Sequence, residues 1–290
     1  MFGRPLRFLT FLAPNMRPVY EFIAHYAGTK LGCATELAVG ESYEQLGLDA
    51  DVGFICGLPY VMLMRQRQPA IELLAAPVLC GKRYRGQPVY FSDVIVGRSS
   101  PFCSFADLRG ATWAYNEPNS HSGFGIVRYH LHRLGEGFGF FGNVVQTGWH
   151  EHSIRQVCSG AVDASAIDSQ VLAIALRDHA ELAPRLRVIA SLGPSTIQPI
   201  VAARRLPESL KAALRAILIG MAGDPAAREA LAHGFVESFV SVTDATYDDI
   251  RTMCAVVEQA RVDGQYGAGK PKASLPVEKP QGKLARTVAS

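Results

Sequence analysis

Residues 113–125 are WAYNEPNSHSGFG, an apolar run that passes through a small polar turn into a segment with two glycines. The apolar residues predict a strand at 111–115, and the pattern from 122 to 134 predicts a helix. The first N–H groups of such a helix lack intrahelical partners, and the helix dipole adds partial positive charge there. The segment therefore predicts an α/β fold with an anion site at the turn.

Five residues of this turn are candidates for that site. Ser120 and Ser122 would donate hydroxyl groups, and Gly123 would let an anion approach the backbone closely. Asn116 and His121 add polar side chains to the same turn. The alternative is that Ser120 or Ser122 only caps the helix.

A second polar cluster, GWHEHS at residues 148–153, opens a predicted helix at 151–159. A histidine beside a helix start can donate a hydrogen bond to an anion, which makes His150 a candidate. His150 and His152 are two residues apart, so on a helix they would point away from each other. This spacing argues against a metal site.

Asp168 follows a predicted apolar strand at 164–167 and precedes a predicted helix at 169–179. At the end of a strand its carboxylate could orient a cationic or hydroxyl-bearing part of a ligand. The alternative is that it caps the helix that follows. The sequence leaves both roles open.

The same alternation of strands and helices continues on both sides of this region, which is the α/β pattern. Further strands are predicted at 6–12, 36–39, 52–56, 71–78, 89–96, 143–146, 186–191 and 199–203, and further helices at 17–31 and 58–67. After residue 203 the chain is predicted to be helical, with one helix starting at Asp224 and another, capped by Asp244, reaching Ala260. We expect residues 1–91 and 197–263 to form a first lobe, 92–196 a second lobe, and 264–290 a disordered basic tail.

Composition and charge limit the classes of function. Of the 290 residues, 48% are apolar and 19% charged, which is typical of a globular protein. The net charge is +3, and residues 268–290 contribute +4 of it through five basic residues and one acidic residue. The remaining body is close to −1, too little positive charge for a nucleic-acid surface. No nucleic-acid partner is expected.

The six cysteines occur singly, without a CxxC pair or a histidine at metal-ligand spacing, so no zinc site is expected. We expect them to be reduced and mostly buried, because most lie beside apolar residues. Three disulfides in an oxidising compartment are the alternative. Motifs of the types GxSxG, GxxxxGK[ST] and HExxH are absent, which favours binding over catalysis, and no cofactor is expected.

The first residues, MFGRPLR, have the charge of the start of a signal peptide, but the apolar run from Phe8 is short and leads to no cleavage site. These residues predict a first strand instead. No stretch approaches the roughly 20 apolar residues of a transmembrane helix. From these features alone the expected location is the cytoplasm.

The assembled segments resemble the phosphonate-binding protein family, the PhnD-like branch of type 2 periplasmic solute-binding proteins. The resemblance is carried by FADLRG at 105–110 leading to SHSG at 120–123, by His150 with SIRQV at 153–157 and GAVDA at 160–164, and by AID at 166–168. Weaker agreement extends it over residues 5–255. His121 stands where the family often has a threonine.

The resemblance implies two α/β lobes with a ligand cleft between them. Ser120, His121, Ser122 and the Gly123 amide would hold the phosphoryl oxygens, with His150 as a further donor. Tyr60 would come from the first lobe and Tyr90 from the hinge, and Asp168 would face the other end of the ligand. The implied function is capture of a phosphonate, phosphite or phosphate by lobe closure, as a monomer serving an ABC transporter permease in the periplasm.

Two rival interpretations remain open at this stage. One is a cytoplasmic enzyme on the same fold, since related folds host synthases of the menaquinone-precursor and thiamin-pyrimidine kinds. The absent export signal and the histidines of the predicted cleft favour it. The other is a sensor that reports the ligand to a partner protein through the basic tail.

Overall fold

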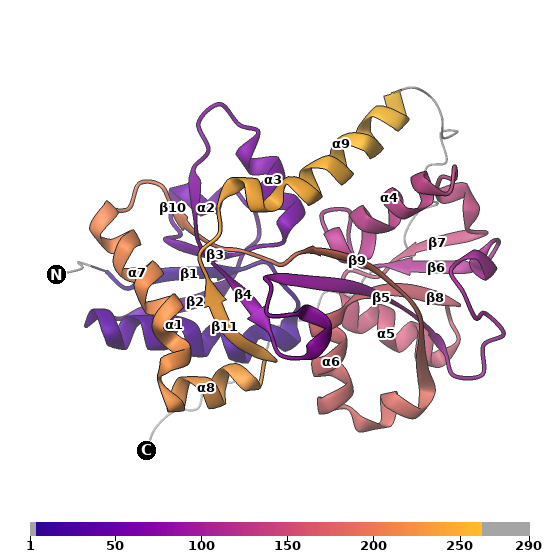
Figure 1. Ribbon diagram of the computed structural model, residues 1–290, viewed down its shortest axis with the longest axis horizontal. Helices are drawn as coiled ribbons and strands as arrows, with labels where there is room; N and C mark the ends of the chain where they lie inside the picture. Colours follow the sequence, from indigo (N-terminus) through magenta and orange to yellow (C-terminus); the bar gives the residue numbers. More distant parts are fainter. Residues whose placement is uncertain (1–3, 263–290) are drawn as a thin grey trace, which may run out of the picture.

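The computed structural model describes residues 4–262 and has two lobes, each built on one β-sheet with helices packed around it (Figure 1). Six strands form the first sheet and five form the second. We call the half of the molecule built on the first sheet lobe I and the other half lobe II. This is the predicted two-lobed α/β architecture.

Lobe I takes its strands from both ends of the described chain. The strands are β1 (Leu6–Thr10), β2 (Thr35–Val39), β3 (Val52–Phe54), β4 (Ile71–Leu79), β10 (Ile200–Ala203) and β11 (Val236–Val240). Their order is β11-β4-β10-β3-β1-β2. β1 is parallel to β2 and β3, whereas β10 and β11 run antiparallel to the strands they pair with.

Lobe II is continuous in sequence. Its strands are β5 (Val89–Gly97), β6 (Thr112–Tyr115), β7 (Asn143–Gln146), β8 (Ala164–Asp168) and β9 (Leu186–Thr196). They lie in the order β7-β6-β8-β5-β9, with β6 parallel to β7 and β8, and β5 antiparallel to β8 and β9. The parallel strands β6 and β8 end side by side, so the turns that follow them meet at one edge of the sheet.

The predicted helices before residue 203 are all present, with bounds that differ by no more than three residues, except that the helix predicted from residue 122 begins at residue 126, after a π-helical turn at 121–125. The helices are α1 (Arg17–Leu31), α2 (Gln45–Leu48), α3 (Gly57–Met64), α4 (Ile126–Arg133), α5 (His150–Ser159), α6 (Ser169–Asp178), α7 (Glu208–Gly220), α8 (Pro225–Ala232) and α9 (Asp248–Val262). The short α2 was not predicted from the sequence.

Two predictions for the last part of lobe I are wrong. The chain after residue 203 is not entirely helical, because β11 pairs with β4, from which it is separated by more than 150 residues. Asp244 does not cap α9. Thr243 instead caps a turn of 3₁₀-helix that precedes α9, and its side chain forms a capping box with Thr246. Asp224 does cap α8, as predicted, by accepting a hydrogen bond from the Ala226 amide.

Two chain crossings and one helix join the lobes. The crossings follow β4 and β9, and residues of both lobes contribute to one continuous apolar core. α9 adds a third connection, which Figure 1 shows extending from lobe I toward α4. Its residue Ile250 packs in a lobe I cluster, while Met253 packs against the core of lobe II.

The six cysteines are all free thiols, so the disulfide alternative is not supported. The expectation that most are buried is wrong: Cys56 is buried, Cys103 is exposed and the others are half-buried. No helix in residues 4–262 is long and apolar enough to cross a membrane. The basic tail predicted from residue 264 lies outside the described residues.

Candidate functional site

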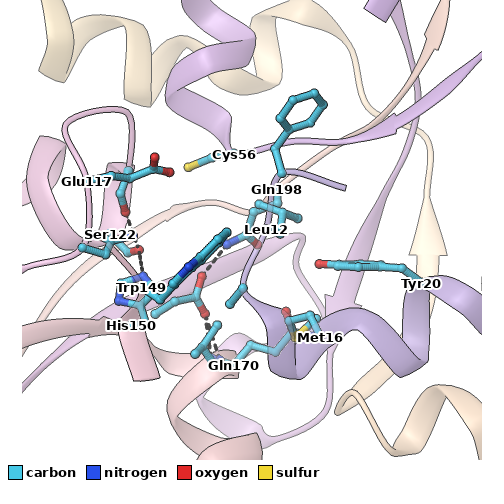
Figure 2. Close-up of a pocket in the computed structure, with 16 residues that line it drawn as sticks. Leu12, Met16, Tyr20, Cys56, Glu117, Ser122, Trp149, His150, Gln170 and Gln198 are labelled. Carbon is cyan, nitrogen blue, oxygen red and sulfur yellow. Dashed lines mark hydrogen bonds between the residues drawn. The ribbon is translucent and has the colours of Figure 1, made fainter. Parts of the chain in front are cut away.

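A pocket lies between the two lobes (Figure 2). On the lobe II side it is bounded by the turns after β6 and β8, and on the lobe I side mainly by residues 11–20, which follow β1. Lobe II contributes mostly polar side chains, and lobe I contributes mostly apolar ones. The lining residues are Phe11, Leu12, Ala13, Met16, Tyr20, Cys56 and Gln198 from lobe I and its crossing segment, and Asn116, Glu117, Ser120, Ser122, Trp149, His150, Asp168, Gln170 and Val171 from lobe II.

The predicted anion cradle begins at Ser120, where the turn after β6 becomes helical. Residues 121–125 form a wide π-helical turn before α4, in which the Gly125 amide donates to the Ser120 carbonyl. The Ser120 hydroxyl accepts a hydrogen bond from the Gly123 amide at 3.1 Å. Ser120 therefore caps the helix, as its alternative role required, and it also lines the pocket.

Ser122 and His150 form a hydrogen-bonded pair inside the pocket. The Ser122 hydroxyl lies 2.9 Å from Nε2 of His150 and 3.3 Å from the Ser120 hydroxyl. Burial lowers the pKa of His150 from 6.5 to about 4, so the imidazole is neutral at pH 7. Its Nδ1 is buried without a hydrogen-bond partner among the described residues. A neutral imidazole with one unused nitrogen can serve either as donor or as acceptor to a ligand.

Gly123 is required by the packing of the neighbouring Asn116 side chain. A Cβ atom at position 123 would lie 2.0 Å from Oδ1 of Asn116 and 3.4 Å from Cε1 of His150. Oδ1 of Asn116 is itself buried without a partner among the described residues. The close approach places an unpaired amide oxygen and the helix start at the same wall of the pocket.

We expect Gly123→Ala to weaken ligand binding about tenfold, because the new methyl group must displace Asn116 from the wall of the pocket. The measurement is isothermal titration calorimetry with a phosphonate. Gly139→Ala is the matched control, because a Cβ there meets nothing within 4 Å. Equal affinity in both variants would show that Asn116 can move without cost to the site.

The pocket is also lined by Asp168, a residue that is only 2% exposed. Its oxygens accept hydrogen bonds from the Gln170 and Val171 amides, at 2.8 and 3.3 Å, and from the Gln198 side chain. Burial is the main cause that raises the pKa of Asp168 to about 6. The capping role of Asp168 is confirmed, and the carboxylate also faces the pocket.

The structure does not bring all predicted site residues to the pocket. Asn116, Ser120, Ser122, His150 and Asp168 line it, and the Gly123 amide lies beside it.

Tyr60, Tyr90 and His121 are almost fully buried and do not line the pocket. The Tyr60 hydroxyl donates to Asp244 at 2.8 Å, and Nε2 of His121 lies 3.0 Å from the Ser195 hydroxyl. His121 does not line the pocket, although Ser120 and Ser122 on either side of it do. The Tyr90 hydroxyl is buried without a partner among the described residues.

Several lining residues were not among the predicted ones. Trp149 and Glu117 are direct neighbours of the predicted residues His150 and Asn116, so the sequence could have predicted that they lie near the pocket. Gln198 lies in the crossing after β9, and Phe11 follows β1. The sequence could not place Phe11 and Gln198 at the pocket, since they are far in sequence from the cradle.

A two-lobed α/β fold with a pocket between its lobes is the fold of periplasmic solute-binding proteins. Residues 15–247 match the family model described as ABC transporter, phosphonate, periplasmic substrate-binding protein. The chain belongs to this family. The family and the similar structures below are binding proteins, in agreement with the sequence interpretation.

Solved structures share this fold at low sequence identity. A binding protein component of an ABC phosphonate transporter from Pseudomonas aeruginosa is 18% identical, covers 90% of this chain and 89% of its own, and has a TM-score of 0.78. PhnD1 from Prochlorococcus marinus, in complex with methylphosphonate, is 17% identical over 90% of this chain and 98% of its own, with a TM-score of 0.74. The aliphatic sulphonate binding protein SsuA from Escherichia coli is 14% identical over 97% of both chains, with a TM-score of 0.58.

Proposed function

We propose that this chain is a solute-binding protein that captures a small phosphorus oxyanion, a phosphonate, phosphite or phosphate, and delivers it to the permease of an ABC transporter. The observation that carries the proposal is the hydrogen-bonded row of Ser120, Ser122 and His150 at a helix start inside the pocket. Helix starts and hydroxyl donors bind oxyanions without a positively charged side chain. Family membership supports the same ligand class.

The proposed mechanism is closure of the two lobes around the ligand. Lobe I would comprise residues 1–91 and 197–263, and lobe II residues 92–196. Contacts between the lobes already exist, one of them between two residues that line the pocket. The Gln198 side chain donates to Asp168, the Gln170 side chain donates to the Gly234 carbonyl at 2.6 Å, and the Asn15 amide donates to Glu151 at 3.1 Å. A ligand that touches both lobes adds contacts only in the closed state, and so shifts the population toward it.

The Ser122 and His150 pair has the spacing of a nucleophile and its base, which bears on the enzyme alternative. In a catalytic pair a third group orients the base, whereas Nδ1 of His150 has no partner among the described residues. We therefore propose that the pair binds the ligand and does not attack it. We further propose that the protein acts as a monomer in the periplasm, the compartment of its family.

A thermal-shift screen tests the proposal with phosphate, phosphite, methylphosphonate, 2-aminoethylphosphonate, sulfate and small carboxylates. A ligand at 100 times its Kd stabilises the folded state by about 2.7 kcal/mol. We expect a selective rise in Tm with at least one phosphorus oxyanion and little change with sulfate or the carboxylates. A flat response to every phosphorus compound would contradict the proposal. Turnover of the best ligand would instead establish an enzyme.

A further inference from the structure

The turn that carries the anion cradle also carries a carboxylate. Glu117 lies in the turn after β6, where its carbonyl accepts a hydrogen bond from the Ser120 amide at 3.2 Å. Its half-buried side chain lines the same pocket as Ser120 and Ser122. Figure 2 shows the Glu117 carboxylate on the side of the pocket that holds Ser122, directed toward Cys56. An oxyanion in the cradle must therefore share the pocket with a second negative group.

The surroundings of Glu117 supply no cation. Neither lysine nor arginine occurs among the described residues that line the pocket. The Glu117 carboxylate accepts no hydrogen bond from another described residue, and burial raises its pKa. The titratable groups around it are Tyr20, Tyr43 and Cys56 from lobe I, and His121, His150 and Asp168 from lobe II.

Burial keeps these groups uncharged at neutral pH, with the exception of Asp168. It raises the pKa values of the two tyrosines and of Cys56, and it lowers the pKa values of both histidines to about 4. Asp168 accepts three hydrogen bonds, from two backbone amides and from the Gln198 side chain, and these stabilise its charged form. Of the two carboxylates that line the pocket, Glu117 is therefore the one that lacks a donor.

An enclosed acceptor without a donor is costly, and a ligand that supplies a donor removes this cost. A phosphonate that keeps one P–OH group is such a ligand, because it has a hydroxyl to donate and only one negative charge. A dianion has no proton to offer Glu117 and increases the repulsion. Because Glu117 lies in the turn of the cradle itself, its donor should be part of the phosphoryl group and not of a distant substituent.

We propose that the site binds its phosphorus oxyanion in the monoprotonated form, with the P–OH group donating a hydrogen bond to Glu117, and that it rejects oxyanions that carry no proton. When the free ligand is a dianion, the proton comes from the solvent. This inference rests on the proposed function and specifies its substrate class. Phosphonates, phosphite and phosphate can carry such a proton at neutral pH, whereas sulfonates and sulfate cannot.

Methylphosphonate and methanesulfonate form a matched pair of probes, because both are tetrahedral and the monoanions differ by one hydroxyl group. We expect methylphosphonate to bind at least about tenfold more tightly at about pH 6, where both are monoanions, since methanesulfonate leaves Glu117 without a donor. Isothermal titration calorimetry measures both affinities. Equal affinities would overturn the inference.

Proton uptake gives a second, independent measurement. At about pH 8.5 free methylphosphonate is mostly a dianion, and titrations in two buffers of different ionisation enthalpy should show uptake of about one proton per bound ligand. The affinity should decrease by about tenfold for each further pH unit. Binding without proton uptake, at an affinity independent of pH in this range, would contradict the proposal.

Glu117→Gln tests whether Glu117 is the group that requires the proton. Glutamine has nearly the same shape, no charge and an N–H donor, so the variant should bind the dianion with proton uptake near zero. The preference for methylphosphonate over methanesulfonate should decrease by about tenfold. Glu229→Gln, at an exposed position of α8, is the matched control and should retain both properties. Full proton uptake in Glu117→Gln would assign the proton to another group, such as His150 or Asp168, and overturn the inference.

Two further outcomes separate this inference from the proposed function. Binding of 2-aminoethylphosphonate alone, without proton uptake, would mean that an ammonium group and not a P–OH group satisfies Glu117. That result would overturn the inference and leave the proposed function intact. Failure of methylphosphonate, phosphite, phosphate and 2-aminoethylphosphonate to bind at any pH would instead refute the proposed function.

Discussion

Ser122→Ala should weaken binding of the phosphorus oxyanion by about 1 to 3 kcal/mol, roughly 5- to 150-fold in Kd, because a hydrogen bond to a charged group is lost in a buried site. Ser122 is 3% exposed and lies between Ser120 and His150 in the row of hydrogen-bonding groups. His150→Ala should cost a similar amount. Isothermal titration calorimetry with the best ligand of the screen measures both.

A stability control separates loss of binding from loss of folding. Ser159→Ala removes an exposed hydroxyl that donates only to its own helix, at the Gln156 carbonyl, and should leave Kd unchanged. The ligand-free Tm of Ser122→Ala should stay close to that of the unmodified protein. Unchanged affinity in both Ser122→Ala and His150→Ala would show that these two residues do not bind the oxyanion, and that the ligand binds in another part of the pocket.

Local patterns were sufficient to predict most of lobe II. Its strands are short apolar runs bounded by glycine and polar turns, and its helices start at residues such as Asp168 that cap them. The anion cradle was predictable for the same reason, since a strand, a polar turn and a helix start lie within residues 113–125. A feature contained in one contiguous segment can be inferred from that segment alone.

Long-range contacts explain what could not be predicted. The segment VESFV at 236–240 is a strand because β4 lies beside it, and nothing in those five residues excludes a helix. Tyr60 and His121 were expected at the ligand, but each has a partner distant in sequence: Tyr60 donates to the exposed Asp244, and His121 lies beside the buried Ser195. A polar side chain satisfied in the core has the same sequence signature as one that faces a ligand.

The apolar wall of the pocket was missed for a related reason. Phe11 directly follows β1 and Tyr20 lies in α1, and on the sequence they are indistinguishable from ordinary core residues. They face the pocket because lobe I presents the ends of its parallel strands to the ends of those of lobe II. That arrangement sets which parts of the ligand each lobe contacts, and only the tertiary structure defines it.

Acidification should destabilise the ligand-free protein through two buried histidines. Burial lowers the pKa of both His121 and His150 from 6.5 to about 4. Between these values the unfolded chain binds protons that the folded chain does not. Stability is therefore complete above pH 6.5 and is lost as the pH falls toward 4, by about 1.4 kcal/mol per pH unit for each histidine.

Asp168 opposes this loss over part of the same range. Its pKa is raised from 3.8 to about 6, mainly by burial, so the folded chain binds a proton there before the unfolded chain does. That proton stabilises the fold as the pH decreases from 6 toward 3.8, and burial raises the pKa of Glu117 in the same direction. The pH dependence of the unfolding free energy therefore combines opposing contributions from the histidines and the carboxylates. A comparison of the unmodified protein with a variant that lacks one of these groups isolates the contribution of that group.

His121→Gln removes one titrating group while keeping a polar side chain opposite the Ser195 hydroxyl. Relative to this variant, the unmodified protein should lose about 3 kcal/mol of unfolding free energy between pH 6.5 and pH 4, the product of the pKa shift and the energy of one pH unit. Urea denaturation at half-unit pH steps in phosphate-free buffer measures the difference. His25→Gln, at an exposed position of α1, should follow the unmodified protein. Parallel curves for the protein and His121→Gln would mean that His121 takes up protons equally in the folded and unfolded states, and that the core around it admits water.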